Sequence, residues 1–214
     1  LGDLLFHGVA MKPGKPVMLG RIEGRPVLGL PGYPLAAQTV LREFAAPLLE
    51  HWGFPPVPKP AIMARLAQPV ISDIGFDEFV PVFAGRIGTV LYGTPHVKGP
   101  AVQMTTVKAN GYCHIPAPAE GYDAGTDCTV FLTTDPGSIE RMFFFTGSID
   151  PALEDLAAIV QDEGIAIHAT NPGNIAGLIA LQTSSCHAAP LILPAYPGAD
   201  SPLPEIDRYL KRDE

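Results

Sequence analysis

The chain has 214 residues, of which 47% are hydrophobic and 17% are charged, and its formal net charge is −8. This composition provides enough apolar surface for one large domain or for two to three small ones, and it excludes a largely disordered chain. An acidic chain repels the phosphates of nucleic acids and anionic lipids, and no apolar run approaches the ~20 residues that a membrane-spanning helix needs. We therefore expect neither nucleic acid nor a membrane as a partner.

The charge is unevenly distributed along the chain. Residues 1–53 hold five basic and four acidic residues, residues 54–140 hold five and eight, and residues 141–214 hold four and ten. An anionic ligand is therefore expected in the first segment. The three cysteines (Cys113, Cys128, Cys186) lack the spacing of a disulfide framework or a zinc site, which favours a reducing cytoplasm. The six histidines show no metal-ligand spacing either, so we predict no metal ligand.

The first segment, residues 1–53, reads as short strands followed by a helix. The chain begins at Leu1 directly in a strand-like run, residues 4–11, and we expect it to be a piece of a longer protein. Strands are predicted at Val17–Ile22 and Arg25–Leu30, with a turn between them. A helix is predicted over Leu35–His51, because apolar residues recur there at helical spacing. These residues are Leu41, Phe44, Ala45, Leu48 and Leu49.

Residues 54–60 contain four prolines and are predicted to form a stiff linker, because proline fits neither a helix interior nor a central strand. Residues 61–138 read as short strands separated by Gly and Pro, which is typical of an all-β barrel or sandwich. The predicted strands are Ile62–Gln68, Glu78–Phe83, Thr89–Tyr92, Tyr112–Ile115 and Cys128–Leu132.

Residues 139–214 change to alternating strands and helices, which indicates a parallel α/β sheet. Strands are predicted at Arg141–Thr146, Ile165–Thr170 and Leu191–Ala195. Helices are predicted at Asp150–Gln161, Asn174–Gln182 and Leu203–Arg212.

Two motifs in the first segment carry a family resemblance. Residues 6–16 read FHGVAMKPGKP and residues 29–37 read GLPGYPLAA. In this order and at this spacing they resemble MoeA-type molybdopterin molybdenumtransferases and their eukaryotic relative, the gephyrin E domain. The resemblance implies that residues 1–53 are the end of a MogA-like α/β domain, whose remainder lies upstream of Leu1.

The resemblance also implies roles for six residues in binding a polyanionic substrate: Lys12, Gly14, Lys15, Pro31, Gly32 and Pro34. Two lysines on a rigid Pro/Gly loop would present cations with little conformational entropy left to lose. The turn at residues 31–34 would bring backbone N–H groups at a helix start near a phosphate. The alternative is that Pro and Gly only shape tight turns and that both lysines face water.

The β segment resembles the C-terminal domain of the same family. Residues 76–82 read FDEFVPV, residues 104–112 read MTTVKANGY, and residues 121–127 read GYDAGTD. The chain departs from the family pattern at Pro81, where an arginine is usual, at Pro100, where many members have serine, and at Tyr33, where asparagine is usual. Loss of an arginine removes a bidentate anion partner that lysine cannot replace.

The third segment resembles the start of a periplasmic-binding-protein-like domain that some MoeA proteins carry. Residues 146–156 read TGSIDPALEDL and residues 169–181 read ATNPGNIAGLIAL. Both lie at strand-to-helix turns, where helix N-termini could bind an oxyanion through Gly147, Ser148, Asn171, Gly173 and Asn174. The alternative is that Ser148 and Asp150 are only helix N-caps, with Pro151 at the first helical position.

The expected function is insertion of molybdate into adenylylated molybdopterin, with Mg²⁺ as cofactor and release of AMP, in a homodimer whose cleft spans two subunits. The family's catalytic and metal-binding carboxylates lie upstream of Leu1, so no catalytic residue is predicted here, and the isolated chain is expected to be inactive. Two alternatives stay open: a molybdate- or tungstate-binding module without turnover, and a structural role in holding partners together.

Overall fold

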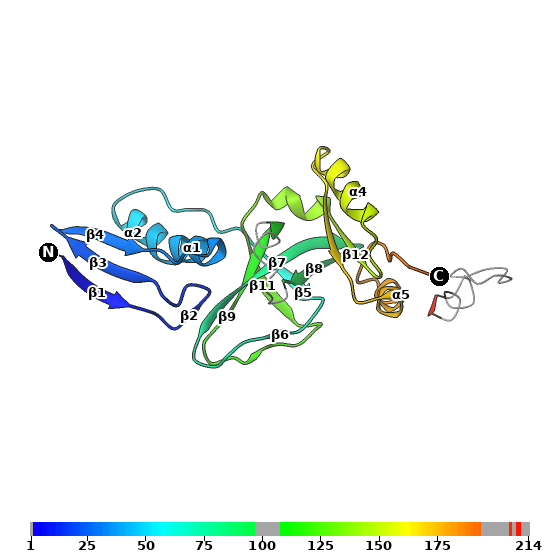
Figure 1. Cartoon of the computed structure of the whole chain (residues 1–214), viewed down its shortest axis with the longest axis horizontal. Coiled ribbons are helices and arrows are strands. Elements are labelled where there is room, and N and C mark those ends of the chain that lie inside the picture. Colours follow the sequence, from blue (N-terminus) through cyan, green and yellow to red (C-terminus); the bar gives the residue numbers. More distant parts are fainter. Residues whose placement is uncertain (1, 97–107, 194–205, 207–208, 211–214) are drawn as a thin grey trace. The chain divides into compact units, whose positions relative to one another are not determined.

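The structure of the chain, a computed structural model, describes residues 2–96, 108–193, 206 and 209–210 (Figure 1). It divides into two compact units. The first comprises residues 1–83 and 93–135, and the second comprises residues 84–92 and 136–214. Among the described residues, no helix is long and apolar enough to cross a membrane.

The first unit begins with a three-stranded antiparallel sheet in the order β1-β3-β4. Its strands are β1 (Asp3–His7), β3 (Met18–Ile22) and β4 (Arg25–Gly29). Glu23 and Gly24 join β3 to β4 with φ values of 50° and 76°, and two positive φ angles characterise the two-residue turns that match strand twist. The predicted hairpin is therefore confirmed.

The predicted strand over residues 4–11 is interrupted. Gly8 has a φ of 85° and its N–H donates to the carbonyl of Val17 at 2.8 Å, so the chain turns away from the first sheet after His7. Met11 and Lys12 then form β2, which pairs in parallel with β7 of a different sheet. The residues around the lysine loop are thus shared between two sheets.

A helix follows at Pro34–His51, as predicted, one residue earlier than expected at its start. It consists of α1 (Pro34–Val40), a π-helical turn η1 (Leu41–Ala45) and α2 (Ala46–His51), and Gly53 follows its end with a φ of 87°. The predicted apolar face is wrong in part, because Leu41 and Leu49 are 45% and 41% exposed. A π-helical turn takes an extra residue and so rotates the side chains that follow out of a 3.6-residue pattern.

The helix packs on the first sheet through a small core. Val40 and Val17 are fully buried and Met11 is nearly so, and Phe6, Leu28 and Phe44 are partly buried against them. The rings of Phe6 and Phe44 lie 5.9 Å apart between centroids. Burying side chains of this size contributes about 1.5–3 kcal/mol each, which holds helix and sheet together.

The β segment forms a closed barrel, as expected. Its sheet has the order β2-β7-β8-β5-β11-β9, and β9 also pairs with β7, so the sheet closes on itself (Figure 1). The strands are β5 (Ala61–Leu66), β7 (Asp77–Ile87), β8 (Val90–Pro95), β9 (Gly111–Ile115) and β11 (Asp127–Leu132). Two short strands that the sequence did not predict, β6 (Val70–Ile71) and β10 (Gly121–Tyr122), pair with each other. Leu66, Val82, Ile115 and Val130 are fully buried in this part of the chain.

Residues 54–60 contain neither helix nor strand. The helix that ends at His51 precedes this segment, and β5 of the barrel follows it. Because contacts group everything from residue 1 to residue 83 in one unit, a domain boundary at residues 54–60 stays a prediction. Residues 104–107 of the second barrel motif, and Pro100, lie outside the described residues.

The second unit contains alternating strands and helices. After a 3₁₀-helix, η3 (Pro136–Arg141), come β12 (Met142–Thr146), α4 (Ala152–Gln161), β13 (Ala166–Thr170) and α5 (Asn174–Gln182). The two strands are parallel, with Phe144 opposite His168. Whether this α/β segment is a periplasmic-binding-protein-like lobe stays a prediction.

The predicted strand at Leu191–Ala195 is wrong for its described residues 191–193, which form no strand. The chain runs beside β12 slightly earlier, where the N–H of His187 donates to the carbonyl of Phe144 at 2.9 Å and Ala188 forms a bridge with Phe145. The pairing continues to Pro190, whose carbonyl accepts from the N–H of Ser148 at 2.8 Å. Most of the predicted helix over residues 203–212 lies outside the described residues.

Candidate functional site

The lysine loop at residues 12–16 is fixed by backbone contacts. Lys12 lies opposite Glu78 in the β2–β7 ladder, and the N–H of Asp77 donates to the carbonyl of Ala10 at 2.9 Å. Gly14 has a φ of 123°, and a Cβ there would lie 2.5 Å from Cε of Met11 and 3.1 Å from Cγ2 of Val40. Only glycine fits this position without strain, so the loop sits tightly against the helix.

Both lysines of the loop face the ring of Phe76. The Nζ atoms of Lys12 and Lys15 lie 4.4 Å and 5.4 Å from its centroid. The ammonium group of Lys12 also donates a hydrogen bond to the carboxylate of Asp73. Cations over an aromatic face are attracted by its quadrupole, so Phe76 gathers the two charges in one place. The structure thus brings Lys12, Gly14 and Lys15 together.

The other three predicted residues lie at the start of the helix. Gly32 and Pro34 are exposed, Pro31 is half-buried, and the N–H of Ala37 donates to the carbonyl of Tyr33 at 2.9 Å. The lysine loop approaches the same helix at Ala36 and Val40, which a Cβ on Gly14 would meet. Pro31, Gly32 and Pro34 lie just before these residues, at the exposed start of the helix.

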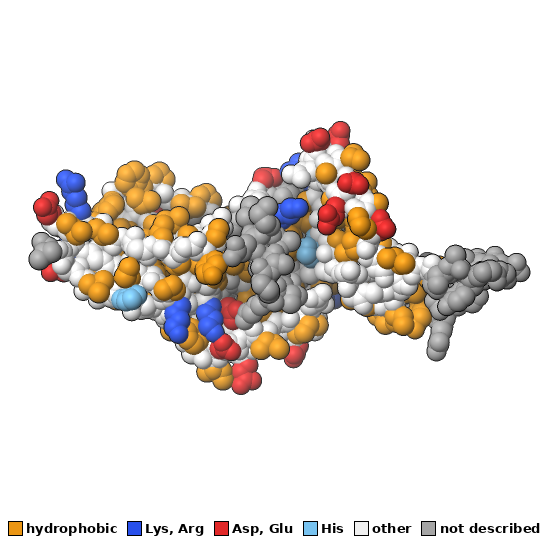
Figure 2. Space-filling view, viewed as in Figure 1, with side chains coloured by type: hydrophobic (Ala, Val, Ile, Leu, Met, Phe, Trp, Pro, Cys, Tyr) orange, Lys and Arg blue, Asp and Glu red, His pale blue; other side chains and the backbone are white. Residues whose placement is uncertain are grey.

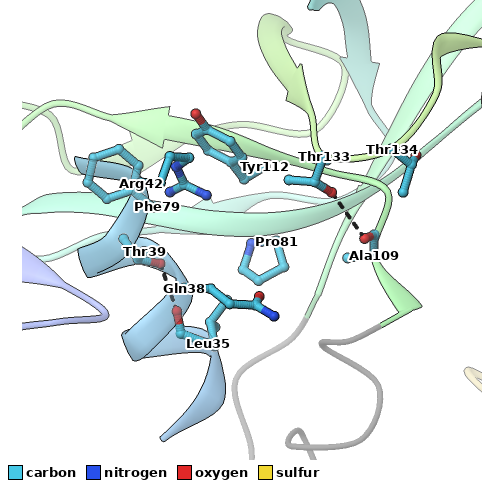
Figure 3. A pocket seen from close by; sticks show the side chains of 11 residues that line it. Leu35, Gln38, Thr39, Arg42, Phe79, Pro81, Ala109, Tyr112, Thr133 and Thr134 are labelled. Atoms are coloured by element: carbon cyan, nitrogen blue, oxygen red, sulfur yellow. Dashed lines mark hydrogen bonds between the residues drawn. The ribbon is translucent and has the colours of Figure 1, made fainter. Parts of the chain in front are cut away.

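A pocket of about 360 Å³ lies between the helix and the barrel (Figure 3). It contains none of the six predicted substrate-binding residues, but Pro81, which stands where an arginine was expected, is in its wall. The lining residues are Leu35, Gln38, Thr39, Arg42, Phe79, Pro81, Ala109, Gly111, Tyr112, Thr133 and Thr134. Arg42 is the one basic residue among them.

Arg42 joins the helix to the barrel. Its Cζ lies 3.5 Å from the ring centroid of Tyr112 and 5.2 Å from that of Phe79, and its Nε donates to Oε1 of Glu43 at 2.7 Å. Its Nη2 is buried without a hydrogen-bond partner in the described part of the chain. Burial raises the pKa of Tyr112, and the positive charge of Arg42 opposes that rise. These contacts hold the side chain of Arg42 at the interface between the helix and the barrel.

Sequence reasoning missed Arg42. It lies one residue after Leu41, inside the π-helical turn, and it points to the barrel while Leu41 faces solvent. An arginine within an otherwise apolar helical repeat was the available signal.

The predicted oxyanion-binding residues of the second unit are engaged with the protein itself. The N–H groups of Gly147, Ser148 and Gly173 donate to the carbonyls of Thr170, Pro190 and Gly147. Asn171 accepts from the N–H of Ile149 at 3.3 Å, and the amide of Asn174 bonds both the N–H and the carbonyl of Ile192. Oxyanion binding there stays a prediction, and it requires displacement of these bonds.

Of the two caps predicted for the first of these turns, Asp150 is present, and α4 begins at Ala152, one residue after Pro151. The carboxylate of Asp150 accepts from the N–H of Ala152 at 2.8 Å, at the start of α4. This bond satisfies one of the unpaired donors of the first helical turn. The capping interpretation therefore explains this turn without a ligand.

The described residues do not fit a Mg²⁺ site. Among them, no group of three or more His, Cys, Asp or Glu side chains is placed to hold a metal ion. The three cysteines are buried free thiols, and a hydrogen bond to Cys128, followed by burial, raises the pKa of Cys113. Cys113 is therefore protonated at neutral pH and does not act as a thiolate ligand.

Comparisons with known proteins agree with the two motif-bearing parts of the first unit. Residues 1–51 match the family described as the probable molybdopterin binding domain, and residues 63–133 match the MoeA C-terminal region, domain IV. A Methanocaldococcus jannaschii protein, named provisionally for molybdopterin biosynthesis, is 30% identical over 133 residues, which are 62% of this chain and 30% of that protein. Molybdopterin molybdenumtransferase 2 of Mycobacterium tuberculosis is 33% identical over 135 residues, which are 60% of this chain and 32% of that protein.

A solved structure shares the fold. The crystal structure of the molybdopterin biosynthesis MoeA protein from Pyrococcus horikoshii superposes with a TM-score of 0.53 at 34% identity, over 63% of this chain and 33% of that one. The chain thus spans about a third of the length of the relatives that it matches. Through its first 133 residues, the chain belongs to the MoeA family of molybdopterin biosynthesis proteins.

Proposed function

We propose that this chain provides the lysine loop and barrel of a molybdopterin molybdenumtransferase, which inserts molybdate into adenylylated molybdopterin and releases AMP. The observation that carries this proposal is the pair Lys12 and Lys15, held over one aromatic ring on a loop fixed to β7. The family membership of residues 1–133 supports the reaction.

The substrates are polyanions, and the loop suits them physically. The ladder and Gly14 fix its backbone before any ligand arrives, so binding loses only the side-chain freedom of the two lysines. Ammonium groups form charge-assisted hydrogen bonds with phosphoryl oxygens, which are stronger than neutral ones. Lys12 and Lys15 would hold a phosphate of the pterin, and the exposed turn at Pro31, Gly32 and Pro34 would contact it from the helix side.

Among the described residues, no acidic cluster is placed to hold Mg²⁺, and Pro81 lines the helix–barrel pocket where an arginine was expected. We therefore propose that catalysis needs further residues, and that a homodimer assembles the complete cleft. The rival interpretation, a molybdate- or tungstate-binding module, is disfavoured by the internal hydrogen bonds of Gly147, Ser148 and Gly173.

Calorimetric titration of the chain with molybdopterin, which carries a phosphate, tests the proposal. Lys12→Ala should weaken binding by about 1–3 kcal/mol, the range of hydrogen bonds to charged groups. Lys59→Ala is the matched control, because it removes the same charge from an exposed position in the Pro-rich segment. Equal affinity of the wild type and the Lys12→Ala variant would refute the assignment.

A further inference from the structure

The turn that faces the lysine loop is as firmly held as the loop itself. Asp73 and Phe76 are its ends, and the N–H of Phe76 donates to the carbonyl of Asp73 at 3.3 Å. Gly75, at a φ of 90°, donates its N–H to the carbonyl of Ala117 at 2.7 Å. Beyond the turn, Asp77 enters the ladder with β2. Backbone bonds therefore fix this turn on both sides, opposite Lys12.

The side chains on these two fixed segments form an ion pair. The Lys12 ammonium donates to the Asp73 carboxylate, although the residues are 61 positions apart in the sequence. The side chains are 33% and 69% exposed. Figure 2 shows basic side chains directly beside acidic ones over β2, so the lysines do not form an uninterrupted basic surface.

Exposure decides how strongly this pair holds. Ion pairs in contact with water contribute little to stability, because solvent screens the attraction. A phosphoryl group offers more charge and more acceptor oxygens than a carboxylate, so it can replace Asp73 at the ammonium. The pair is thus positioned by the backbone but easily exchanged.

We propose that Asp73 is the resting counter-ion of Lys12, and that its displacement sets the affinity of the lysine loop for phosphoryl ligands. The proposal rests on the proposed function, because it assigns ligand binding to Lys12. Asp73 acts through Lys12 as a positioning residue and touches no reacting atom. Its removal should therefore strengthen ligand binding, whereas damage to the structure would weaken it.

The test is a calorimetric titration of the 214-residue chain with inorganic pyrophosphate at low ionic strength. Asp73→Asn should lower the dissociation constant roughly two- to fivefold, which corresponds to the small energy of an exposed pair. Asp73→Glu should retain the wild-type value, since it keeps the carboxylate. Asp127→Asn is the matched control, because Asp127 is 59% exposed in its pair with Arg65 and carries the same charge.

The Lys12→Ala background separates this proposal from the function on which it rests. There, Asp73→Asn should have no effect, since the ammonium with which Asp73 pairs has been removed. If Lys12→Ala weakens binding but Asp73→Asn leaves the dissociation constant unchanged, the counter-ion role is wrong and the proposed function stands. If Lys12→Ala itself has no effect, both fail. An equal gain in Asp127→Asn, or in the Lys12→Ala background, would overturn the proposal in favour of a general charge effect.

Discussion

The guanidinium of Arg42 lies over the ring of Tyr112, with 3.5 Å between Cζ and the ring centroid. This contact connects the helix at residues 34–51 to strand β9 of the barrel. Phe131 stacks on Tyr112 at 5.3 Å between centroids, so the contact continues into β11. The paired side chains of Arg42 and Glu43 are only 21% and 25% exposed, which limits screening of their charges by water.

Arg42→Ala should destabilise the first unit by about 1–2 kcal/mol, the range of a largely desolvated cation–π contact. Arg42→Lys should recover part of this loss, because lysine keeps the charge but not the planar group. Urea unfolding, monitored by the fluorescence of Trp52, the single tryptophan, measures the loss of stability in both variants. Arg65→Ala breaks a more exposed pair and should cost about 0.5 kcal/mol or less. Equal losses at Arg42 and Arg65 would contradict the bridging role.

Gly14→Ala should destabilise the chain by about 2 kcal/mol or more, because a methyl group would press on Met11 and Val40 at a positive φ. Gly32 belongs to the same predicted site, but a Cβ there meets no atom within 4 Å. Gly32→Ala should therefore change stability by about 0.5 kcal/mol at most. Thermal unfolding of the two variants side by side makes the comparison, and similar losses would show that the loop is not tightly packed.

His96 should make stability fall in mild acid. Burial lowers its pKa from the ordinary 6.5, so below pH 6.5 the unfolded chain binds a proton that the folded chain does not. The free energy of unfolding therefore decreases as the pH falls from 6.5 through the lowered pKa. Urea midpoints between pH 7.5 and pH 5 should decline more steeply in the wild type than in His96→Gln. Parallel pH profiles would exclude a contribution from His96.

The purified chain should release no AMP above background when it is incubated with adenylylated molybdopterin, molybdate and Mg²⁺. The reason is that its described residues form no metal-binding cluster and that Pro81 offers no charged contact in the pocket. Chromatographic detection of AMP provides the measurement. Release at a rate that depends on chain concentration would show that the catalytic groups lie within these 214 residues.

Local chemistry made much of the fold predictable. A turn between two short strand-like runs predicted the hairpin, apolar residues at helical spacing predicted the helix, and Gly- and Pro-bounded apolar runs located the main barrel strands. Each of these signals acts within a few residues. The π-helical turn was not predictable in this way, since no local residue type marks it, and Leu49, which follows it, is exposed.

The composition of the site depended on contacts that a single sequence does not encode locally. Lys12 was identified from its motif, but its neighbours Asp73 and Phe76 come from a turn more than sixty residues later. Arg42 meets Tyr112 only because the barrel places β9 beside the helix. Likewise, Ser148 and Asn174 were predicted to bind an oxyanion, but in the structure they form hydrogen bonds with Pro190 and Ile192, on a segment that follows α5.

The central claim, that the lysine loop binds the anionic pterin, is tested most directly by NMR of the chain with isotopically labelled lysine side chains. The chain has six lysines, so each signal can be followed separately during titration with adenylylated molybdopterin. The account predicts that the signals of Lys12 and Lys15 shift together and saturate, while that of Lys59 does not move. Saturable shifts confined to other lysines, with Lys12 unchanged, would contradict it.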